Sequence, residues 1–334
     1  MQAFYCDDTP MALPEGHRFP MEKYRMLRER VARLLPQVDL HGSDPVSVEQ
    51  LCLAHDAAYV RAVEDGKLEP AVQREIGFVW SPQLVLRSRR SVGATLQAAR
   101  AALTDGIAVN LAGGTHHASA ARGAGFCVFN DVAVAARVVQ QEQQGWHARA
   151  GGEGSRRMQI AVVDLDVHQG DGTAAIFADD PSVFTLSMHG ERNFPFTKIR
   201  GDLDVDLPDG CGDPRYLDEL DIALAQMWTL TAARAPQLLF YLAGCDPHEG
   251  DRLGRLRLTA DGLRRRDAMV LSAARERGIP VVVMMAGGYG RDLDRMVGLQ
   301  AQTVHQCWLS WWHTQRERQR EQRVELQGPD NPAP

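Results

Sequence analysis

The chain lacks the features typical of secreted, membrane-spanning and nucleic-acid-binding proteins. Its six cysteines include no Cys-x-x-Cys pair, so we expect a reduced, cytoplasmic protein and not a disulfide scaffold. No stretch reaches about 18 consecutive apolar residues, and residues 1–20 carry acids and prolines where a signal peptide needs an apolar run. The net charge is -6 and no basic cluster dominates. Neither nucleic acid nor a membrane is therefore an expected partner.

The composition is that of an ordinary globular protein, with 44% hydrophobic and 24% charged residues. At 334 residues the chain can bury one large core. Because no internal repeat or domain linker interrupts it, we expect a single domain over residues 1–316. Residues 317–334 are charged and then rich in proline, which predicts a fraying helix followed by a disordered tail.

From residue 107 onward, short apolar segments alternate with helical segments, which favours a parallel sheet with helices on both faces. Strands are predicted at 2–6, 107–112, 160–165, 183–188, 238–243 and 279–285. Helices are predicted at 21–35, 46–64, 82–105, 130–144, 214–234, 259–277 and 291–316. Residues 147–159 are rich in glycine and arginine and are predicted to form a mobile surface loop.

The stretch IAVVDLDVHQGDG, residues 160–172, holds the densest group of reactive side chains. Its first half is short, apolar and rich in β-branched residues, as in a strand that is buried on both faces. Asp164, Asp166 and His168 follow at every second position, so an extended backbone projects all three to one side. Asp171 lies just beyond them. Carboxylates and an imidazole that converge at a strand end predict a cation site.

Small or reactive residues also follow the other predicted strands from residue 107 onward. They are Gly113 to His117, Ser187 to His189, Gly244 to Asp246, and Gly287 to Tyr289. Ligands of an open parallel sheet bind outside the carboxyl ends of its strands. We therefore expect these groups and the central cluster to meet at one edge of the sheet.

Asp166, His168 and Asp246 are the natural ligand trio, since two follow one strand and the third follows another. Three protein ligands leave a fourth position open to water, which distinguishes catalytic from structural zinc sites. Iron(II) accepts the same nitrogen and oxygen ligands. Such an ion activates water and polarises a substrate carbonyl.

Adjacent His116 and His117 have an evident use beside such an ion. One imidazole can act as general base towards water and later as general acid towards a departing amine. Asp164 and Asp171 are spare carboxylates that can fix the histidine tautomers. Tyr289 follows two glycines, and its phenol can donate a hydrogen bond to the oxyanion that develops on the attacked carbonyl.

In their order and spacing, five segments resemble the motifs of the zinc-dependent histone deacetylase family. They are GGTHHASAARGAGFCVFND (113–131), VDLDVHQGDGTA (163–174), LSMHGERNFPF (186–196), LAGCDPHEGDRLGRLRLT (242–259) and MAGGYG (285–290). The resemblance extends from Gly16 to Gly290, and HRFPMEKY near the start is similar to the bacterial branch close to class IV. It implies the single-domain α/β arginase/deacetylase fold, a parallel sheet of about eight strands between helices, and hydrolysis of an acyl amide such as N-acetyl-lysine.

Position by position, the resemblance implies a role for each candidate residue. Asp166, His168 and Asp246 are the zinc ligands, His117 is the proton-transferring base with His116 as its electrostatic partner, Asp164 and Asp171 orient the two histidines, and Tyr289 stabilises the transition state. Gly125 and Phe126 resemble the wall of the acyl-lysine tunnel, with Phe194 and Leu253 as neighbours. A structural potassium ion is implied at Asp164, Asp166, His168, Ser187 and Met188.

Departures from the family pattern concern the substrate. NFPFTK replaces the Pro-Gly-Thr-Gly loop of many class I members, SPQLVLRSRRS offers no counterpart of their acidic rim residue, and Ala121 stands where some relatives carry an acid. The catalytic positions are retained. The substrate, acyl-lysine in protein or a small acylated amine, and the oligomeric state are left open.

Two other functions are considered. An arginase-like ureohydrolase has the same fold but needs two manganese ions, and Pro247 and His248 follow Asp246 where a second acid of an Asp-x-Asp pair is required. A non-catalytic acyl-lysine binding protein is expected to have lost His117, Tyr289 or a zinc ligand, and all are present. Both functions are therefore disfavoured.

The remaining aromatic residues of note receive structural interpretations. His17 and His55 are expected to be surface or loop histidines and not metal ligands. The cluster of Trp308, Trp311 and Trp312 within one predicted helix is expected in the core or at a subunit interface.

Overall fold

The computed structural model describes residues 1–9, 11, 13–149 and 157–327. Within this part of the chain, eight strands form one sheet, and all neighbours are parallel. Their order across the sheet is β2-β1-β3-β8-β7-β4-β5-β6. The strands are β1 (Gln2–Tyr5), β2 (Asp39–Gly42), β3 (Ile107–Asn110), β4 (Ile160–Asp164), β5 (Val183–Gly190), β6 (Leu203–Leu207), β7 (Leu238–Leu242) and β8 (Val281–Met284).

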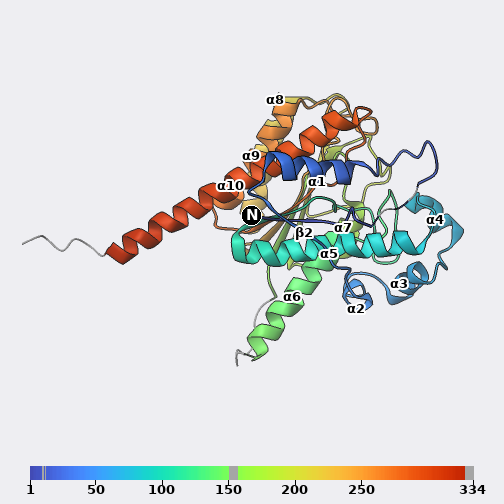
Figure 1. Ribbon diagram of the computed structural model, residues 1–334, viewed down its shortest axis with the longest axis horizontal. Helices are drawn as coiled ribbons and strands as arrows, with labels where there is room; N and C mark the ends of the chain where they lie inside the picture. Colours follow the sequence, from blue (N-terminus) through green and yellow to red (C-terminus); the bar gives the residue numbers. More distant parts are fainter. Residues whose placement is uncertain (10, 12, 150–156, 328–334) are drawn as a thin grey trace, which may run out of the picture.

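Helices cover both faces of the sheet (Figure 1). One face packs against α1 (Lys23–Leu34), α8 (Asp213–Leu230), α9 (Ala260–Arg275) and α10 (Leu293–Gln327). The other packs against α5 (Pro82–Asp105) and α6 (Asp131–Arg149), with the shorter α2 (Val48–Leu51), α3 (Ala57–Glu64), α4 (Pro70–Ile76) and α7 (Asp171–Phe177) on the same side. A 3-10 turn, Ala232–Arg234, follows α8.

The central strands are apolar on both sides because each side packs against a helical layer. In β4, Ala161 and Val163 belong to the core beneath α8, α9 and α10, whereas Ile160 and Val162 belong to the core beneath α5 and α6. Every residue of the strand is buried. A continuous apolar run is the pattern of such a strand, and this explains why the strands predicted from the sequence are present.

The sequence does not indicate β2 and β6, and these two strands form the two edges of the sheet. Their sequences, DLHG and LDVDL, carry charged residues, and most of their positions are partly or fully exposed. Charges on edge strands discourage pairing with a second chain. The same charges break the apolar run on which the prediction depends.

The helical segment predicted at 46–64 is wrong as one helix, because it consists of α2 and α3 with a loop between them. Ser47 is the N-cap of α2, and it forms a reciprocal capping box with Gln50 that fixes the start of this helix. The short helices α4 and α7 are not indicated by the sequence pattern, since seven residues give only two turns of periodicity.

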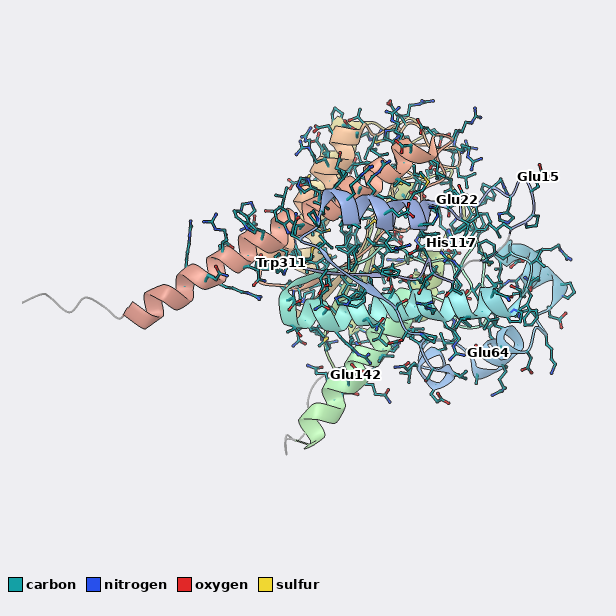
Figure 2. All side chains as sticks on the ribbon, viewed as in Figure 1. Glu15, Glu22, Glu64, His117, Glu142 and Trp311 are labelled. Carbon is teal, nitrogen blue, oxygen red and sulfur yellow. The ribbon has the colours of Figure 1, made fainter. Side chains whose placement is uncertain are left out.

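The last helix, α10, continues to Gln327, so the first part of segment 317–334 is helical, as predicted. Residues 328–334 lie outside the described residues, as do 150–156 of the predicted loop. The tryptophan cluster is expected in the core or at a subunit interface, and Trp308 and Trp311 pack against the core. Trp311 lies near the point where α10 leaves the body of the fold, away from His117 (Figure 2). In the described chain, no helix combines the length and the apolarity needed to cross a bilayer.

The carboxyl ends of the central strands are aligned. Asn110, Met284, Leu242, Asp164 and Ser187 lie opposite one another on β3, β8, β7, β4 and β5. The loops after these residues therefore leave the same edge of the sheet. This confirms that the reactive groups which follow the strands meet at one edge.

Candidate active site

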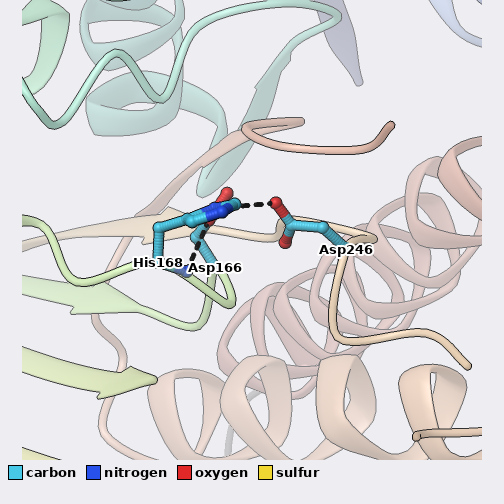
Figure 3. Close-up of side chains that lie close together, drawn as sticks. All are labelled: Asp166, His168 and Asp246. Atoms are coloured by element: carbon cyan, nitrogen blue, oxygen red, sulfur yellow. Dashed lines mark hydrogen bonds and ion pairs between the residues drawn. The ribbon is translucent and has the colours of Figure 1, made fainter. Parts of the chain in front are cut away.

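The three predicted metal ligands lie together at this edge. Asp166 and His168 follow β4, and Asp246 follows β7, the neighbouring strand. All three are buried, and one ligand atom from each lies within 4.8 Å of the others. His168 Nδ1 is 2.9 Å from Asp166 Oδ1 and 3.3 Å from Asp246 Oδ2 (Figure 3). The donor set of one imidazole nitrogen and two carboxylate oxygens suits zinc or iron(II).

Backbone amides hold the two carboxylates in place. The N–H of Gly287 donates to Asp166 Oδ2 at 2.7 Å, and the N–H of Val167 donates to Asp246 Oδ1 at 3.0 Å. Asp246 Oδ2 is buried and has no hydrogen-bond partner among the described residues. A buried carboxylate oxygen without a donor is costly unless a cation neutralises it. The residues present therefore fit a bound metal ion.

Two glycines, Gly244 and Gly287, leave room for the carboxylates of Asp166 and Asp246. A Cβ atom on Gly244 would lie 2.6 Å from Asp166 Oδ2, and one on Gly287 would lie 2.5 Å from the same oxygen. Both distances are too short for any side chain. The glycines that follow β7 and β8 are thus required by the close approach of the ligands.

Without a metal ion, His168 and Asp246 bind protons more strongly than isolated side chains do. Burial and the charge of Asp166 raise the pKa of Asp246 to about 7. Burial lowers the pKa of His168, but the two carboxylates outweigh it and raise the value to about 10. A metal ion must displace such protons, so binding of the ion is coupled to proton release.

His116 and His117 each bond to a different carboxylate. His116 Nδ1 is 2.6 Å from Asp164 Oδ2, and His117 Nδ1 is 2.6 Å from Asp171 Oδ1. Their ring centroids are 4.2 Å apart. Each carboxylate directs Nδ1–H towards itself and leaves Nε2 of its histidine available. Asp164 and Asp171 are the two carboxylates that the sequence predicts for this role, and the structure shows which histidine each one contacts.

The two histidines differ in charge. Burial opposes the charge on His116, but the Asp164 and Asp166 carboxylates prevail and raise its pKa to about 9. Burial lowers the pKa of His117 to about 4, and the nearby charge of His116 acts in the same direction. At neutral pH His116 is therefore cationic, while His117 is neutral and can accept a proton.

Tyr289 is held over the site by contacts to its backbone. Its N–H donates to Asp251 Oδ2 at 2.6 Å, and its carbonyl accepts from Arg252 Nε at 2.6 Å. The buried ammonium of Lys23 donates to the Gly288 carbonyl at 3.2 Å and lies 5.3 Å from the Tyr289 ring centroid. Burial raises the pKa of Tyr289 well above its ordinary value. The phenol thus stays protonated and able to donate.

A cavity of about 420 Å³ opens onto these groups. His117, His168 and Tyr289 line it, and all three are buried. The four residues predicted for the substrate tunnel also line it, namely Gly125, Phe126, Phe194 and Leu253. The cavity therefore joins the predicted tunnel to the predicted catalytic groups.

The tunnel wall is built from aromatic rings that are held rigidly. Phe126 has a φ of 67°, which is unusual for an aromatic residue, and its N–H donates to the Ile76 carbonyl at 2.9 Å. The Phe194 ring stands edge-on to His117 with centroids 4.8 Å apart. Gly125 lies between these walls, and a Cβ on it would come within 2.5 Å of His117 Cδ2.

Two residues near the site, Phe19 and Lys23, are not predicted from the sequence. Phe19 packs against Phe126 at 5.3 Å and against Tyr289 at 6.3 Å between ring centroids. Both residues belong to HRFPMEKY, the segment that carried the family resemblance but received no role. An aromatic residue and a lysine in a loop and a first helical turn give no independent sequence signal.

A second buried cluster, centred on Arg266, supports the loops that carry the ligands. Arg266 Nη1 donates to the carbonyls of Gly244 at 2.5 Å and Leu165 at 3.4 Å, which lie just before Asp246 and Asp166. Its guanidinium also bonds to Asp267 Oδ1. Arg266 is fully buried. It therefore connects the ends of β4 and β7 from beneath the metal ligands.

The other predicted residues have clear positions. Ser187 lies opposite Asp164 in register, and Met188 follows it in β5; a potassium ion there stays a prediction. His17 is a loop residue that bonds to the Gly77 carbonyl, as expected. His55 also lies in a loop, as expected, and it is buried there, with Nδ1 on the Ser119 carbonyl and Nε2 accepting from the Asn130 N–H.

The chain is similar to known proteins over most of its length. An uncharacterized protein of Picosynechococcus sp. is 43% identical over 88% of this chain and 93% of its own length. A histone deacetylase-like amidohydrolase of Pseudomonas aeruginosa is 30% identical over 85% of this chain and 75% of its own. The crystal structure of an HDAC homolog complexed with SAHA superimposes with a TM-score of 0.73 at 25% identity, and the match covers 92% of this chain and 83% of that one.

The family assignment rests on most of the chain. The histone deacetylase domain matches residues 17–304, which include all eight candidate metal-binding and catalytic residues. The all-parallel eight-stranded sheet is the arginase/deacetylase fold predicted from the sequence. The chain therefore belongs to the histone deacetylase family.

Proposed function

We propose that the protein is a zinc-dependent deacylase that hydrolyses the amide bond of an N-acylated amine, with acetyl-lysine in protein or a small acetylated amine as substrate. One observation carries the proposal. Asp166, His168 and Asp246 gather in a buried site in which Asp246 Oδ2 accepts no hydrogen bond from the described residues, beside a cavity that His117, His168 and Tyr289 line.

Asp166, His168 and Asp246 would hold an ion, which would supply a Lewis acid to polarise the substrate carbonyl and to lower the pKa of a water molecule. His117 accepts the proton of the attacking water at Nε2, since its Nδ1 is bonded to Asp171. When the C–N bond breaks, His117 returns this proton to the leaving nitrogen. One water is consumed, and a carboxylic acid and an amine are formed.

His116 and Tyr289 stabilise charge during this step. The negative charge that develops on the carbonyl oxygen receives a hydrogen bond from the phenol of Tyr289. The cation on His116, which Asp164 fixes, keeps His117 neutral before the reaction. His116 thus acts as an electrostatic partner and not as a second base.

The remaining assignments belong to the same proposal. Zinc is favoured, although iron(II) accepts the same ligands. The potassium ion is proposed at Asp164, Asp166, His168, Ser187 and Met188. A cytoplasmic location is supported by the six cysteines, all of which are free thiols. Residues 1–316 are proposed to form the catalytic domain.

Two alternatives make different predictions. An arginase-like ureohydrolase needs a second metal site, and in the described ranges the only group of three His, Cys, Asp or Glu residues with metal-binding spacing is Asp166, His168 and Asp246. A non-catalytic acyl-lysine binding protein would bind its ligand without releasing the acyl group. Nothing in the site favours it.

The proposal is tested by hydrolysis of a chain-length series of acyl-lysine substrates, from acetyl to myristoyl, together with acetylated polyamines. The protein is loaded with zinc, and a chelator serves as control. We expect turnover that the chelator abolishes and that falls by about 10²–10⁴-fold in His117→Ala, while His305→Ala, at an exposed histidine, retains it. Binding of acyl-lysine without hydrolysis would support the binding protein, and urea release from guanidino substrates would support the ureohydrolase.

A further inference from the structure

The mouth of the cavity has a charge opposite to that of the whole protein. The chain has 43 acidic and 37 basic residues other than histidine. Of the five Asp, Glu, Lys or Arg side chains that line the cavity, however, four are arginine: Arg18, Arg74, Arg192 and Arg255. The fifth is Glu75. A basic opening in an acidic protein requires a local explanation.

Ion pairs account for only part of these charges. Glu75 is paired with Arg122 and therefore does not offset the arginines of the mouth. Arg255 is paired with Asp209 at 3.0 Å. Arg18, Arg74 and Arg192 are exposed and form no ion pair with the described residues. Three guanidinium groups thus face the opening with their donors available.

The three arginines come from separate parts of the fold. Arg18 precedes α1, Arg74 belongs to α4, and Arg192 follows β5. Their convergence on one opening is therefore a property of the tertiary structure and not of one basic sequence run. Convergent guanidinium groups are well suited to bind a carboxylate, because each offers paired N–H donors.

The position of the arginines indicates which half of the substrate bears the negative charge. The buried groups at the inner end act on the amide, so the acyl group lies there and the amine portion extends outward. We propose that the preferred substrate is an N-acylated amine whose amine portion carries a carboxylate, either the α-carboxylate of a free N-acyl amino acid or an acidic residue beside an acyl-lysine. This inference rests on the proposed function and specifies its substrate class.

The same charges disfavour cationic substrates. Acetylated polyamines and acetyl-lysines flanked by lysine or arginine bring positive charge to a positive opening, and like charges at this range repel. The exposed charges are screened by salt, since the Debye length falls from about 30 Å at 0.01 M to about 8 Å at 0.15 M ionic strength. Discrimination should therefore be strongest at low salt.

The test uses three acetyl-lysine peptides that differ only in flanking Glu, Gln or Lys, together with free Nε-acetyl-lysine and its α-amide. We expect kcat/KM to be about three- to tenfold higher for the Glu peptide than for the Gln peptide at low salt, with the Lys peptide lowest. The effect should lie in KM and shrink as salt rises. The kcat/KM of free Nε-acetyl-lysine should exceed that of its α-amide only if an α-carboxylate is enough for recognition. This comparison separates an α-carboxylate from an acidic neighbouring residue as the source of the negative charge.

Variants test the arginines directly. Arg18→Gln, Arg74→Gln and Arg192→Gln should each lower the Glu-to-Gln ratio, and the triple variant should bring it close to one. Arg200→Gln, at an exposed arginine in the same loop as Arg192 that does not line the cavity, should leave the ratio unchanged. Equal kcat/KM for all three peptides, or a ratio that survives the triple variant, overturns the inference.

Calorimetric titration of the same peptides into the zinc-loaded protein separates this inference from the proposed function. Preferential binding of the Glu peptide without hydrolysis of any substrate would refute the proposed function and retain the arginine site. Hydrolysis with no charge preference in either binding or turnover would do the reverse.

Discussion

Two groups of charged side chains lie fully buried at the ends of β4 and β7, on either side of the same loops. The cluster of Arg266 and Asp267 is balanced by the protein itself: Asp267 accepts hydrogen bonds from Arg266, Tyr241 and Thr303 at 2.6–3.0 Å. In the ligand group, two carboxylates share one imidazole, and Asp246 Oδ2, 3.3 Å from His168 Nδ1, accepts no hydrogen bond within the described chain.

This difference distinguishes buried charges that support the fold from buried charges that bind a ligand. Arg266 has one carboxylate and several backbone carbonyls to satisfy its five N–H groups, and nothing further needs to bind there. The ligand group retains an excess of negative charge and borders a cavity. A buried group that the protein leaves unbalanced is stable only when a proton or cation completes it.

The largest expected effect is the loss of metal from Asp246→Asn. The amide can keep the hydrogen bond from the Val167 N–H but offers no anionic oxygen. We expect zinc affinity to fall by more than the roughly 100-fold that is typical when only a partner of a ligand is removed, and turnover to fall with it. Metal content after dialysis and the rate of deacetylation measure this.

The same substitution should not destabilise the metal-free protein, because it removes an unbalanced buried charge. Its thermal midpoint without metal should equal or exceed that of the parent. Asp179→Asn, which removes an exposed charge, is the control for net charge. A variant that keeps a full complement of zinc would show that Asp246 is not a ligand.

Arg266→Met, in contrast, should strongly destabilise the protein. It leaves Asp267 buried without its cation, and loss of one partner of a buried pair costs about 3–5 kcal/mol of unfolding free energy. Arg265→Met, at the exposed neighbouring position of α9, should change it by less than about 0.5 kcal/mol. Urea unfolding of the two variants makes the comparison, and equal stability would mean that the Arg266 cluster does not support the ligand loops.

Tyr289→Phe tests a smaller and purely catalytic contribution. The ring and its contacts with Phe19 and Phe126 remain, but the donor to the developing oxyanion is lost. We expect kcat to fall by about 10²–10³-fold, with zinc content and thermal midpoint unchanged. A loss of zinc, or a kcat close to that of the parent, would contradict the role assigned to the phenol.

The sequence predicted those parts of the fold and site that depend on local pattern. Buried strands such as β4 are visible as apolar runs, and the ligands that follow them are placed by the rule that parallel strands end at one edge. Arg266 could not be found in this way. It is the last of three consecutive arginines, 264–266, which look like a solvated run, and only the packing of α9 turns this one inward.

The arginine-lined mouth escaped prediction for a related reason. Arg18, Arg74 and Arg192 lie far apart in the sequence and on segments whose relative positions no periodicity encodes. The absence of an acidic rim residue was visible, but its replacement by a basic opening was not. Local patterns indicate which residues are reactive, whereas tertiary structure decides which charges surround them.

His55 provides a third kind of buried ionisable group, one that is balanced only when neutral. Its Nδ1–H donates to the Ser119 carbonyl, while Nε2 accepts from the Asn130 N–H. A proton on Nε2 would therefore point at the Asn130 N–H and break this hydrogen bond. Burial accordingly lowers its pKa to about 4.

The sign of the pH effect follows from these pKa values. The unfolded histidine gains a proton near pH 6.5, whereas the folded one does so only near pH 4. In that window the unfolded state binds more protons, so stability falls as the pH falls, by an amount on the order of 3 kcal/mol over the whole window. His55→Gln should flatten this part of the pH profile of unfolding free energy even though it lowers stability at pH 7, while His305→Gln, at an exposed histidine, should leave the slope intact. If His55→Gln retained the full slope, the acid sensitivity would belong to other groups, and the neutral hydrogen-bonding pattern of His55 would have no energetic consequence.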